Sequence, residues 1–203
     1  KVVARRQGGL LDVTVRDDFA ATRRVWWSYA EPRGGGKTAT AVATGVLSDD
    51  DSRLQEVAVI FQQQPAWGST MHYGSRLVFD GDGALFVTPG ERSGPRELAQ
   101  DGSTHLGKVL RISPEGGAAA GNPTLRGGQP EIWSSGHRNL QSAALGPDGA
   151  LWTVEHGPKG GDELNRLLPG RNYGWPVISY GENYSGAPVG EGITARQGME
   201  QPV

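Results

Sequence analysis

Four polar stretches of this chain combine residue types that can do chemistry on a small molecule. The first contains His72, in GSTMHYGSRLVF, and the second contains Glu91, in TPGERSG. An imidazole titrates near neutral pH and can take a proton from an alcohol. A carboxylate bonded to one imidazole nitrogen fixes the tautomer and makes the other nitrogen more basic. Taken singly, His72 is more often explained as a half-buried loop histidine bonded to a backbone carbonyl, and Glu91 is about equally explained as a turn carboxylate in solvent.

The third stretch, GHRNLQS, contains Arg138, Asn139 and Gln141. An arginine offers a fixed fork of donors, and the amides offer both donors and acceptors. Such a group can hold a polar, anionic or quinonoid molecule and stabilise charge on an oxygen. The competing interpretation is a solvated loop.

The fourth stretch is the densest, EHGPKGGDELNRLLPGRNYGWP, residues 155–176. Its glycines permit close approach of backbone to a ligand, and Pro158 adds a carbonyl without a competing N–H. Asp162 and Glu163 supply hard oxygens of the kind that Ca²⁺ takes, although the spacing is not that of an EF-hand loop. The competing interpretation is a surface loop whose Tyr and Trp pack in the core.

The elements that must position these stretches are short strands joined by tight turns. Residues 76–91 (RLVFDGDGALFVTPGE) and 142–157 (SAALGPDGALWTVEHG) both predict strand, turn, strand, and they share the core DGAL. Asp82 and Asp148 in these segments lie 66 positions apart,. Residues 10–31 are a weaker copy, with Asp17-Asp18 and the residues after them in the turn. His72 and Glu91 therefore flank one predicted strand pair and are expected to lie near each other.

The segments between these hairpins also repeat, since GVLSDD and VAVIFQQQ resemble GKVLRISPEG and EIWSSGHRN. Each unit thus supplies about four short strands, the content of a β-propeller blade, and Asp-Gly turns suit twisted strand pairs. An ordinary sandwich with similar hairpins is less favoured because both parts repeat in the same order. About three units fit into residues 1–203, whereas a closed ring needs about 4 to 8 blades. We therefore predict an all-β fold, a single-domain partial β-propeller that is truncated and incomplete at both ends.

Composition narrows the class of protein. The net charge of −2 and the absence of a basic block argue against a nucleic-acid partner, and no apolar run approaches the roughly 18 residues of a membrane span,. The 32 glycines and 13 prolines are spread between short apolar runs, as in proteins of many strands and turns,. With no cysteine, disulfides and thiolate metal sites are excluded,. Residues 31–40 and 115–129 are predicted to be surface loops.

In combination, the motifs GHRNLQS, EHGPKGGDELN, NYGWP, MHYGSRLVFDGDG and LGKVLRI resemble the soluble pyrroloquinoline-quinone (PQQ)-dependent aldose sugar dehydrogenases. This is the glucose/sorbosone dehydrogenase family, and the resemblance runs from RRQGGLLDV to EQPV. It implies a six-bladed β-propeller, of which this chain holds the N-terminal half.

The resemblance also implies a reaction. His72 would take the proton of the C1 hydroxyl of an aldose, hydride would pass to PQQ, and a lactone would be the product. Glu91 would orient His72, although glucose-oxidising members carry Asp there. Arg138 would polarise the quinone, while Gln7, Asn139 and Gln141 would hold the cofactor.

The same resemblance implies calcium. The carbonyls of Gly157 and Pro158 would bind a catalytic Ca²⁺, and Glu163 with the Tyr173 carbonyl would bind a structural one. Leu140 replaces the proline that is usual after the Arg-Asn pair. Because relatives contribute further cofactor-binding residues from later blades, we expect this fragment to be inactive alone.

Two other functions compete with the sugar dehydrogenase. One is a non-catalytic propeller that binds a glycan or a protein, and the other is a metal-dependent lactonase-type hydrolase. The first residues lack the features of a signal peptide, so a periplasmic or secreted location is implied by the family alone. The sugar and the external electron acceptor stay open at this point.

Overall fold

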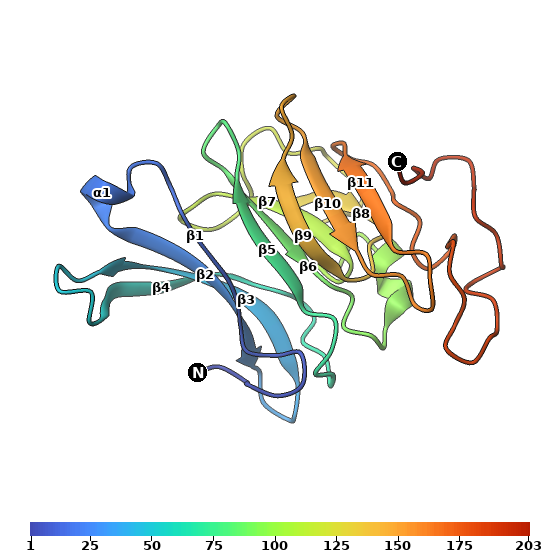
Figure 1. The fold of residues 1–203 in the computed structure, drawn as a ribbon, viewed down its shortest axis with the longest axis horizontal. Helices are drawn as coiled ribbons and strands as arrows, with labels where there is room; N and C mark the ends of the chain where they lie inside the picture. The colour runs from blue at the N-terminus through green and yellow to red at the C-terminus, as the bar shows by residue number, and fades with distance from the viewer.

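Eleven β-strands form three consecutive antiparallel sheets in the computed structural model, which describes residues 1–203 (Figure 1). Within each sheet the strands pair in chain order. The first sheet contains β1 (Leu10–Val15), β2 (Arg24–Pro32), β3 (Thr38–Leu47) and β4 (Leu54–Gln62). The second contains β5 (Gly74–Phe79), β6 (Leu85–Pro89), β7 (Lys108–Ile112) and β8 (Ile132–Ser135). The third contains β9 (Leu140–Leu145), β10 (Leu151–Glu155) and β11 (Glu163–Leu167).

The core lies between successive sheets, because alternate residues of a strand point to opposite faces. In β6, Leu85 and Val87 belong to the apolar cluster shared with the first sheet, whereas Phe86 between them belongs to the cluster shared with the third. The first cluster also takes Trp26 and Val42 from the first sheet. Burying each such side chain stabilises the fold by about 1.5–3 kcal/mol. The second sheet is therefore apolar on both faces.

The first strand of each sheet lies beside the first strand of the next, since β5 packs against both β1 and β9. Side chains tie these three strands together across the sheets. Asp12 in β1 accepts the backbone N–H of Leu77 in β5 at 2.9 Å, and Arg76 donates to the carbonyl of Gln141 in β9 at 2.7 Å. The segments that precede β1, β5 and β9 consequently meet at one end of the molecule.

The Asp-Gly turns form as the sequence indicates. Asp80 accepts the backbone N–H groups of Asp82 and Ala84, both at 2.9 Å, and Gly83 has a φ of 81°. A positive φ at this position is available to glycine at little cost. In the turn between β9 and β10, Gly149 has a similar φ of 75°, and it is Asp148 that accepts the backbone N–H of Ala150 at 3.1 Å. These turns fix the register of the two hairpins.

The all-β antiparallel fold predicted from the repeats is confirmed, with three differences in detail. The connection between β1 and β2 contains a short helix, α1 (Phe19–Thr22), where a tight turn was expected. The third sheet has three strands, and residues 168–203 follow it with turns and isolated bridges. Residues 38–40, predicted as part of a surface loop, are buried in β3. A short 3₁₀-helix, η1 (Arg96–Gln100), is the other helical segment, and no helix has the length and apolar character to cross a membrane.

Candidate active site

His72 and Glu91 form a buried hydrogen-bonded pair. His72 directly precedes β5 and Glu91 follows β6, and the antiparallel pairing of Gly74 with Pro89 brings these two ends together. The imidazole Nδ1 lies 2.8 Å from Glu91 Oε1, and the residues are 7% and 1% exposed. Nε2 of His72 makes no hydrogen bond within the chain. The pair therefore has one nitrogen fixed by a carboxylate and the other free for a substrate.

The backbone around this pair is strained and closely packed. His72 has a φ of 50°, a left-handed conformation that costs a non-glycine residue of order 1–3 kcal/mol,. A Cβ on Gly90 would lie 2.3 Å from the carbonyl oxygen of His72, so glycine is required there. The second carboxylate oxygen of Glu91 accepts the backbone N–H of Ser93. Strain of this kind persists only where the surroundings hold it in place.

Three amide side chains predicted to hold a cofactor converge beside this pair. Gln7, Asn139 and Gln141 line one cavity of about 310 Å³. Gln7 accepts the backbone N–H of His72 at 2.7 Å, and Asn139 accepts that of Gly74 at 3.2 Å. Gln141 donates to Asn139 at 3.1 Å, which fixes the amide orientation of both. These contacts connect the segment before β1 with the starts of the second and third sheets.

Arg138 is buried next to this cavity, and its side chain links two parts of the site. Its Nη1 donates to the carbonyls of His156 at 2.9 Å and Gly157 at 2.7 Å, and the guanidinium lies 5.3 Å from the ring centroid of Trp175. Its backbone N–H donates to Glu155 at 2.7 Å, and its carbonyl accepts the backbone N–H of Glu91 at 2.9 Å. The remaining guanidinium donors have no acceptor within the chain, so they are available to an anionic or quinonoid ligand.

The loop between β10 and β11 supplies oxygen atoms. The carbonyl of Gly157 keeps one lone pair beside its bond from Arg138, and those of Pro158 and Tyr173 accept no hydrogen bond from the chain,. Burial, and next the charge of the neighbouring Glu155, raise the pKa of Glu163 to about 7. A bound divalent cation would relieve this charge repulsion.

The structure does not gather all the predicted metal ligands around one cavity. Arg138, Gly157 and Glu163 line a small common cavity, whereas Pro158 and Tyr173 are not part of its wall. The Tyr173 hydroxyl donates to the Arg166 carbonyl at 2.7 Å. No group of three or more His, Asp or Glu side chains is placed to hold a metal ion. A cation here would therefore depend on backbone carbonyls.

Three further polar side chains line the cavity of about 310 Å³ without having been singled out from the sequence: Tyr73, Arg76 and His156. Tyr73 and Arg76 lie within the stretch GSTMHYGSRLVF that contains His72, and this position was the available signal. His156 borders both cavities, and its Nδ1 lies 3.7 Å from a carboxylate oxygen of Asp162. The site is thus richer in polar groups than the four stretches predicted.

A second histidine–glutamate pair lies in the third sheet. His137 Nδ1 is 3.3 Å from Glu155 Oε1, and His137 Nε2 is 2.9 Å from the hydroxyl of Ser134. The ring is fully buried and stacks on Tyr173, with centroids 5.0 Å apart. Both nitrogens of this imidazole are occupied, so the pair supports the fold around Arg138.

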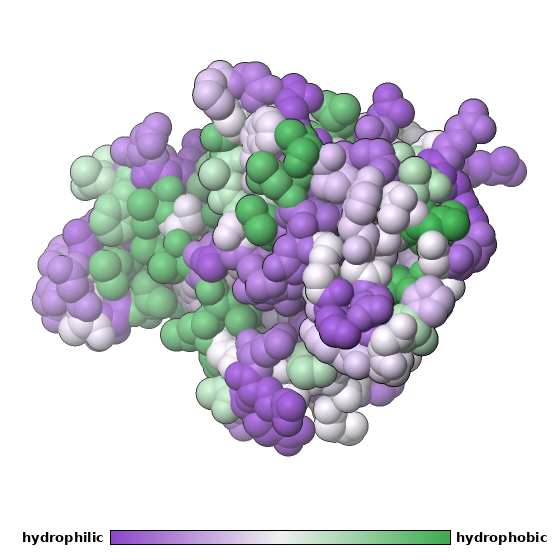
Figure 2. Space-filling model, turned by 45° about the vertical axis from the view of Figure 1, so that its right-hand side comes forward, coloured by the Kyte–Doolittle hydropathy of each residue, from purple (hydrophilic) through white to green (hydrophobic).

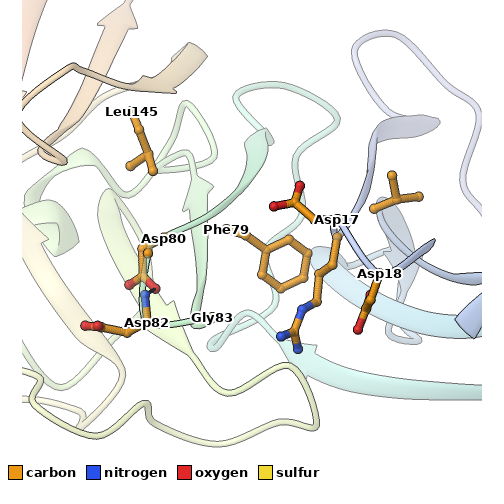
Figure 3. A pocket seen from close by; sticks show the side chains of 10 residues that line it. Asp17, Asp18, Phe79, Asp80, Asp82, Gly83 and Leu145 are labelled. Carbon is orange, nitrogen blue, oxygen red and sulfur yellow. Dashed lines mark hydrogen bonds between the residues drawn. The ribbon is translucent and has the colours of Figure 1, made fainter. Parts of the chain in front are cut away.

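The opposite ends of β1, β5 and β9 enclose a different cavity, of about 530 Å³ (Figure 3). Asp17 and Asp18 approach it from the connection before α1, and Asp80 and Asp82 approach it from the turn between β5 and β6. None of the predicted site residues lines it. Asp80 is engaged in a 2.6 Å bond from Arg111 and in the turn itself. The larger cavity therefore lies away from the candidate active site.

An all-β chain whose successive sheets bring a buried His–Glu pair, three amides and an arginine to one end is a propeller-like protein with a polar ligand site. The glucose/sorbosone dehydrogenase family matches residues 1–203, and the chain belongs to this family. It is 47% identical to the aldose sugar dehydrogenase YliI of Escherichia coli (strain K12), over all of this chain and 55% of that protein. The chain therefore spans about half the length of the curated relatives that it matches.

Solved structures agree with this assignment. A crystal structure of a glucose dehydrogenase superposes with a TM-score of 0.94 at 51% identity, covering 99% of this chain and 59% of that one. The PQQ-bound form of an aldose sugar dehydrogenase from Streptomyces coelicolor gives a TM-score of 0.78 at 29% identity, covering 99% of this chain and 54% of that one.

The residues present fit the cofactors that the family implies. One cavity is lined by the amides of Gln7, Asn139 and Gln141, and the neighbouring cavity that shares His156 is lined by Arg138, whose unused guanidinium donors suit a polar, anionic quinone,. The free carbonyl oxygens of the β10–β11 loop and of Tyr173 suit Ca²⁺, which takes six to eight oxygen ligands,.

Proposed function

We propose that this chain is the N-terminal half of a PQQ- and Ca²⁺-dependent dehydrogenase that oxidises the C1 hydroxyl of aldose sugars to lactones. The observation that carries the proposal is the geometry of His72. Its Nδ1 is held by buried Glu91, and its Nε2 has no partner within the chain. Its backbone N–H is bound by Gln7, which lines a cavity together with Asn139 and Gln141.

Each residue has a distinct part in the proposed reaction. When bound, PQQ would supply the hydride acceptor and Ca²⁺ a Lewis acid. His72 Nε2 accepts the proton of the C1 hydroxyl as the C1 hydrogen leaves with its electron pair, and the sugar becomes a lactone. Glu91 keeps the proton of the resting imidazole on Nδ1 and stabilises the imidazolium that forms. Arg138 donates to an oxygen that gains negative charge, and the amides orient the bound molecule.

We further propose that the three sheets are blades of a six-bladed ring. The outer face of the first sheet supports this, because it exposes a row of apolar residues to solvent: Leu10, Val13, Val15, Val57 and Val59. Apolar residues gather at the left of Figure 2, where the first sheet lies. A patch of this kind on a stable protein is normally covered, and another blade would cover it. A periplasmic or secreted location belongs to the same proposal, supported by the family resemblance.

The test is a titration of the full-length protein and of this chain with PQQ and Ca²⁺, followed by absorbance before and after an aldose is added. We expect the full-length protein to bind PQQ and the sugar to reduce it, while this chain alone does not turn over. A full-length protein that binds no PQQ would refute the proposal and favour a non-catalytic propeller that binds a glycan or a protein. Screening aldoses and soluble electron acceptors in the same assay identifies both partners.

Calcium gives a separate prediction. Chelation with EDTA is expected to release PQQ from the full-length protein and to lower its melting temperature, because a ligand that binds only the folded state stabilises it by mass action. Readdition of Ca²⁺ should restore both properties. If EDTA changes neither, the calcium assignment is wrong while the PQQ assignment stands.

A further inference from the structure

Arg92, the residue after Glu91, is a fully buried arginine that makes no salt bridge. Its guanidinium instead donates to oxygen atoms of two other segments. Nη1 and Nη2 donate to the carbonyl and the hydroxyl of Thr38, both at 2.8 Å. Nη2 also donates to the carbonyl of Ser69, and Nε donates to that of Met71 at 3.1 Å. Burying a cation is costly unless its donors are satisfied, so these acceptors must be held in place.

The acceptors enclose the segment that contains His72. Met71 and Tyr73 are its neighbours in the chain, and the Arg92 guanidinium lies 3.8 Å from the centroid of the Tyr73 ring. The backbone N–H of Arg92 donates to the carbonyl of His72 at 3.3 Å. The residues after β6 therefore hold His72 in two ways, because Glu91 binds the imidazole and Arg92 binds the carbonyls of Met71 and of His72 itself.

The need for such a grip is visible in the backbone. His72 and Arg92 have φ values of 50° and 71°, conformations that side chains other than glycine rarely adopt,. A free segment would relax from them and turn the imidazole away from Glu91. We propose that Arg92 is a positioning residue that holds residues 69–73 in the strained conformation in which His72 meets Glu91 and keeps Nε2 free.

The second histidine–glutamate pair shows what happens without this residue. The residue after Glu155 is His156, whose side chain is 58% exposed and packs under no neighbouring segment in the way that Arg92 does. The His137 ring is instead fixed by stacking on Tyr173 and by a hydrogen bond between its Nε2 and Ser134, so its second nitrogen is not available to a ligand. Arg92 allows His72 to be held from its backbone, so that no side chain has to occupy Nε2.

The inference rests on the proposed function only in taking His72 as the base, and its main test does not require a cofactor. The chain has four histidines, so ¹⁵N-histidine labelling gives four sets of imidazole signals, and His72→Gln assigns the set of His72. In the unaltered chain we expect a single His72 tautomer with the proton on Nδ1. In Arg92→Met we expect loss of that single tautomer, with the signals of His137 unchanged. Arg92→Lys should fall between the two, since one ammonium group cannot span all the acceptors.

Arg111→Met is the matched control. Arg111 is also buried over an aromatic ring, 5.6 Å from the centroid of Trp133, but it binds the Asp80 turn at the opposite end of the sheet. This variant should lose stability without changing the His72 signals. If Arg92→Met does not fold, Thr38→Val decides, because it removes one acceptor and keeps the side-chain shape. Unchanged His72 signals in the folded variant would overturn the proposal.

The full-length protein provides a second readout. Arg92→Met should lower kcat about 100-fold, the scale of a small misplacement of a catalytic group, with KM within about twofold. Equal losses in kcat for Arg92→Met and Arg111→Met would mean that Arg92 acts only through stability. Absence of sugar oxidation in the unaltered full-length protein would refute the proposed function, and the tautomer measurement would still decide the role of Arg92.

Discussion

The molecule contains two histidine–glutamate pairs on successive sheets, and they differ in whether the imidazole Nε2 has a hydrogen-bond partner. His72 and Glu91 are 19 residues apart, and His137 and Glu155 are 18 apart. In each pair the histidine precedes the first strand of a sheet and the glutamate lies at the end of the second strand. In the first pair Nε2 is free, whereas in the second it is bonded to Ser134.

This difference separates an imidazole that can take part in a reaction, His72, from one that can only stabilise the fold, His137. Identical chemistry, a buried carboxylate on Nδ1, is available to both imidazoles. Only His72 can accept a proton from a ligand, because the second nitrogen of His137 already has a partner. A buried histidine–carboxylate pair is therefore evidence for catalysis only when the second imidazole nitrogen has no partner in the protein.

The comparison predicts its largest effect for His72. His72→Ala in the full-length protein should lower the rate of sugar oxidation by about 10²–10⁴-fold, the usual contribution of a general base, while PQQ still binds. Steady-state kinetics and an absorbance titration measure the two properties. Near-normal turnover would remove His72 from the mechanism and with it the functional difference between the pairs.

For the second pair the expected effect is on stability. His137→Ala should lower the free energy of unfolding by about 3 kcal/mol, because it leaves a cavity in the core and removes the imidazole partner of Glu155, which keeps only the N–H donors of Arg138 and Asn165,. Urea unfolding of the variant measures this loss. His72→Ala removes the imidazole partner of another buried carboxylate, Glu91, and should cost a comparable amount, so the loss of sugar oxidation is what distinguishes the two variants,. An unfolding free energy that His137→Ala leaves unchanged would show that the second pair does not support the fold.

Gly90 offers a way to disturb the first pair without removing either partner. A Cβ there would lie 2.3 Å from the His72 carbonyl and 3.2 Å from that of Arg138. Gly90→Ala should therefore cost about 2 kcal/mol of stability, through backbone displacement, and should weaken PQQ binding. Gly68→Ala, where a Cβ meets nothing within 4 Å, is the control. Thermal unfolding that does not distinguish the two variants would contradict the close packing around His72.

The repeated hairpins were readable in the sequence because their signals are local. Shared DGAL turns and alternating apolar residues predicted the strand pairs of the second and third sheets, and the structure confirms them. The helix α1 was missed, since four residues without a helical capping pattern carry no periodic signal,. The burial of residues 38–40 was missed because it depends on packing beneath a segment about 30 residues away.

The site could be only partly predicted from the sequence, because some of its contacts are local and others join distant segments. Placing His72 and Glu91 at the two ends of one hairpin was sufficient to predict their proximity. The role of Glu155 as acceptor for both His137 and Arg138 was not predicted, because it requires the pairing of β9 with β10 and a register shift between Val154 and Glu155.

The smallest predicted effect concerns Lys108, beneath the second pair. Lys108 lies opposite Ser135 in the pairing of β7 with β8. Its ammonium group donates to the carbonyls of Leu98 at 2.8 Å and Leu106 at 2.7 Å. Burial lowers the pKa of Lys108 to about 7, against an ordinary 10.5 in the unfolded chain. Between these pH values the unfolded chain binds more protons, so the penalty of burying this group is relieved as pH rises from about 7 and returns as pH falls.

Lys108→Met removes that dependence. We expect the free energy of unfolding of the unaltered chain to rise relative to the variant by about 1 kcal/mol between pH 7 and pH 8.5, measured by urea unfolding. The exposed Lys37 provides the control, and Lys37→Met should leave the slope unchanged. A slope that Lys108→Met does not alter would show that Lys108 stays charged when buried. The carbonyls of Leu98 and Leu106 would then be sufficient to stabilise the charged ammonium group in its buried position.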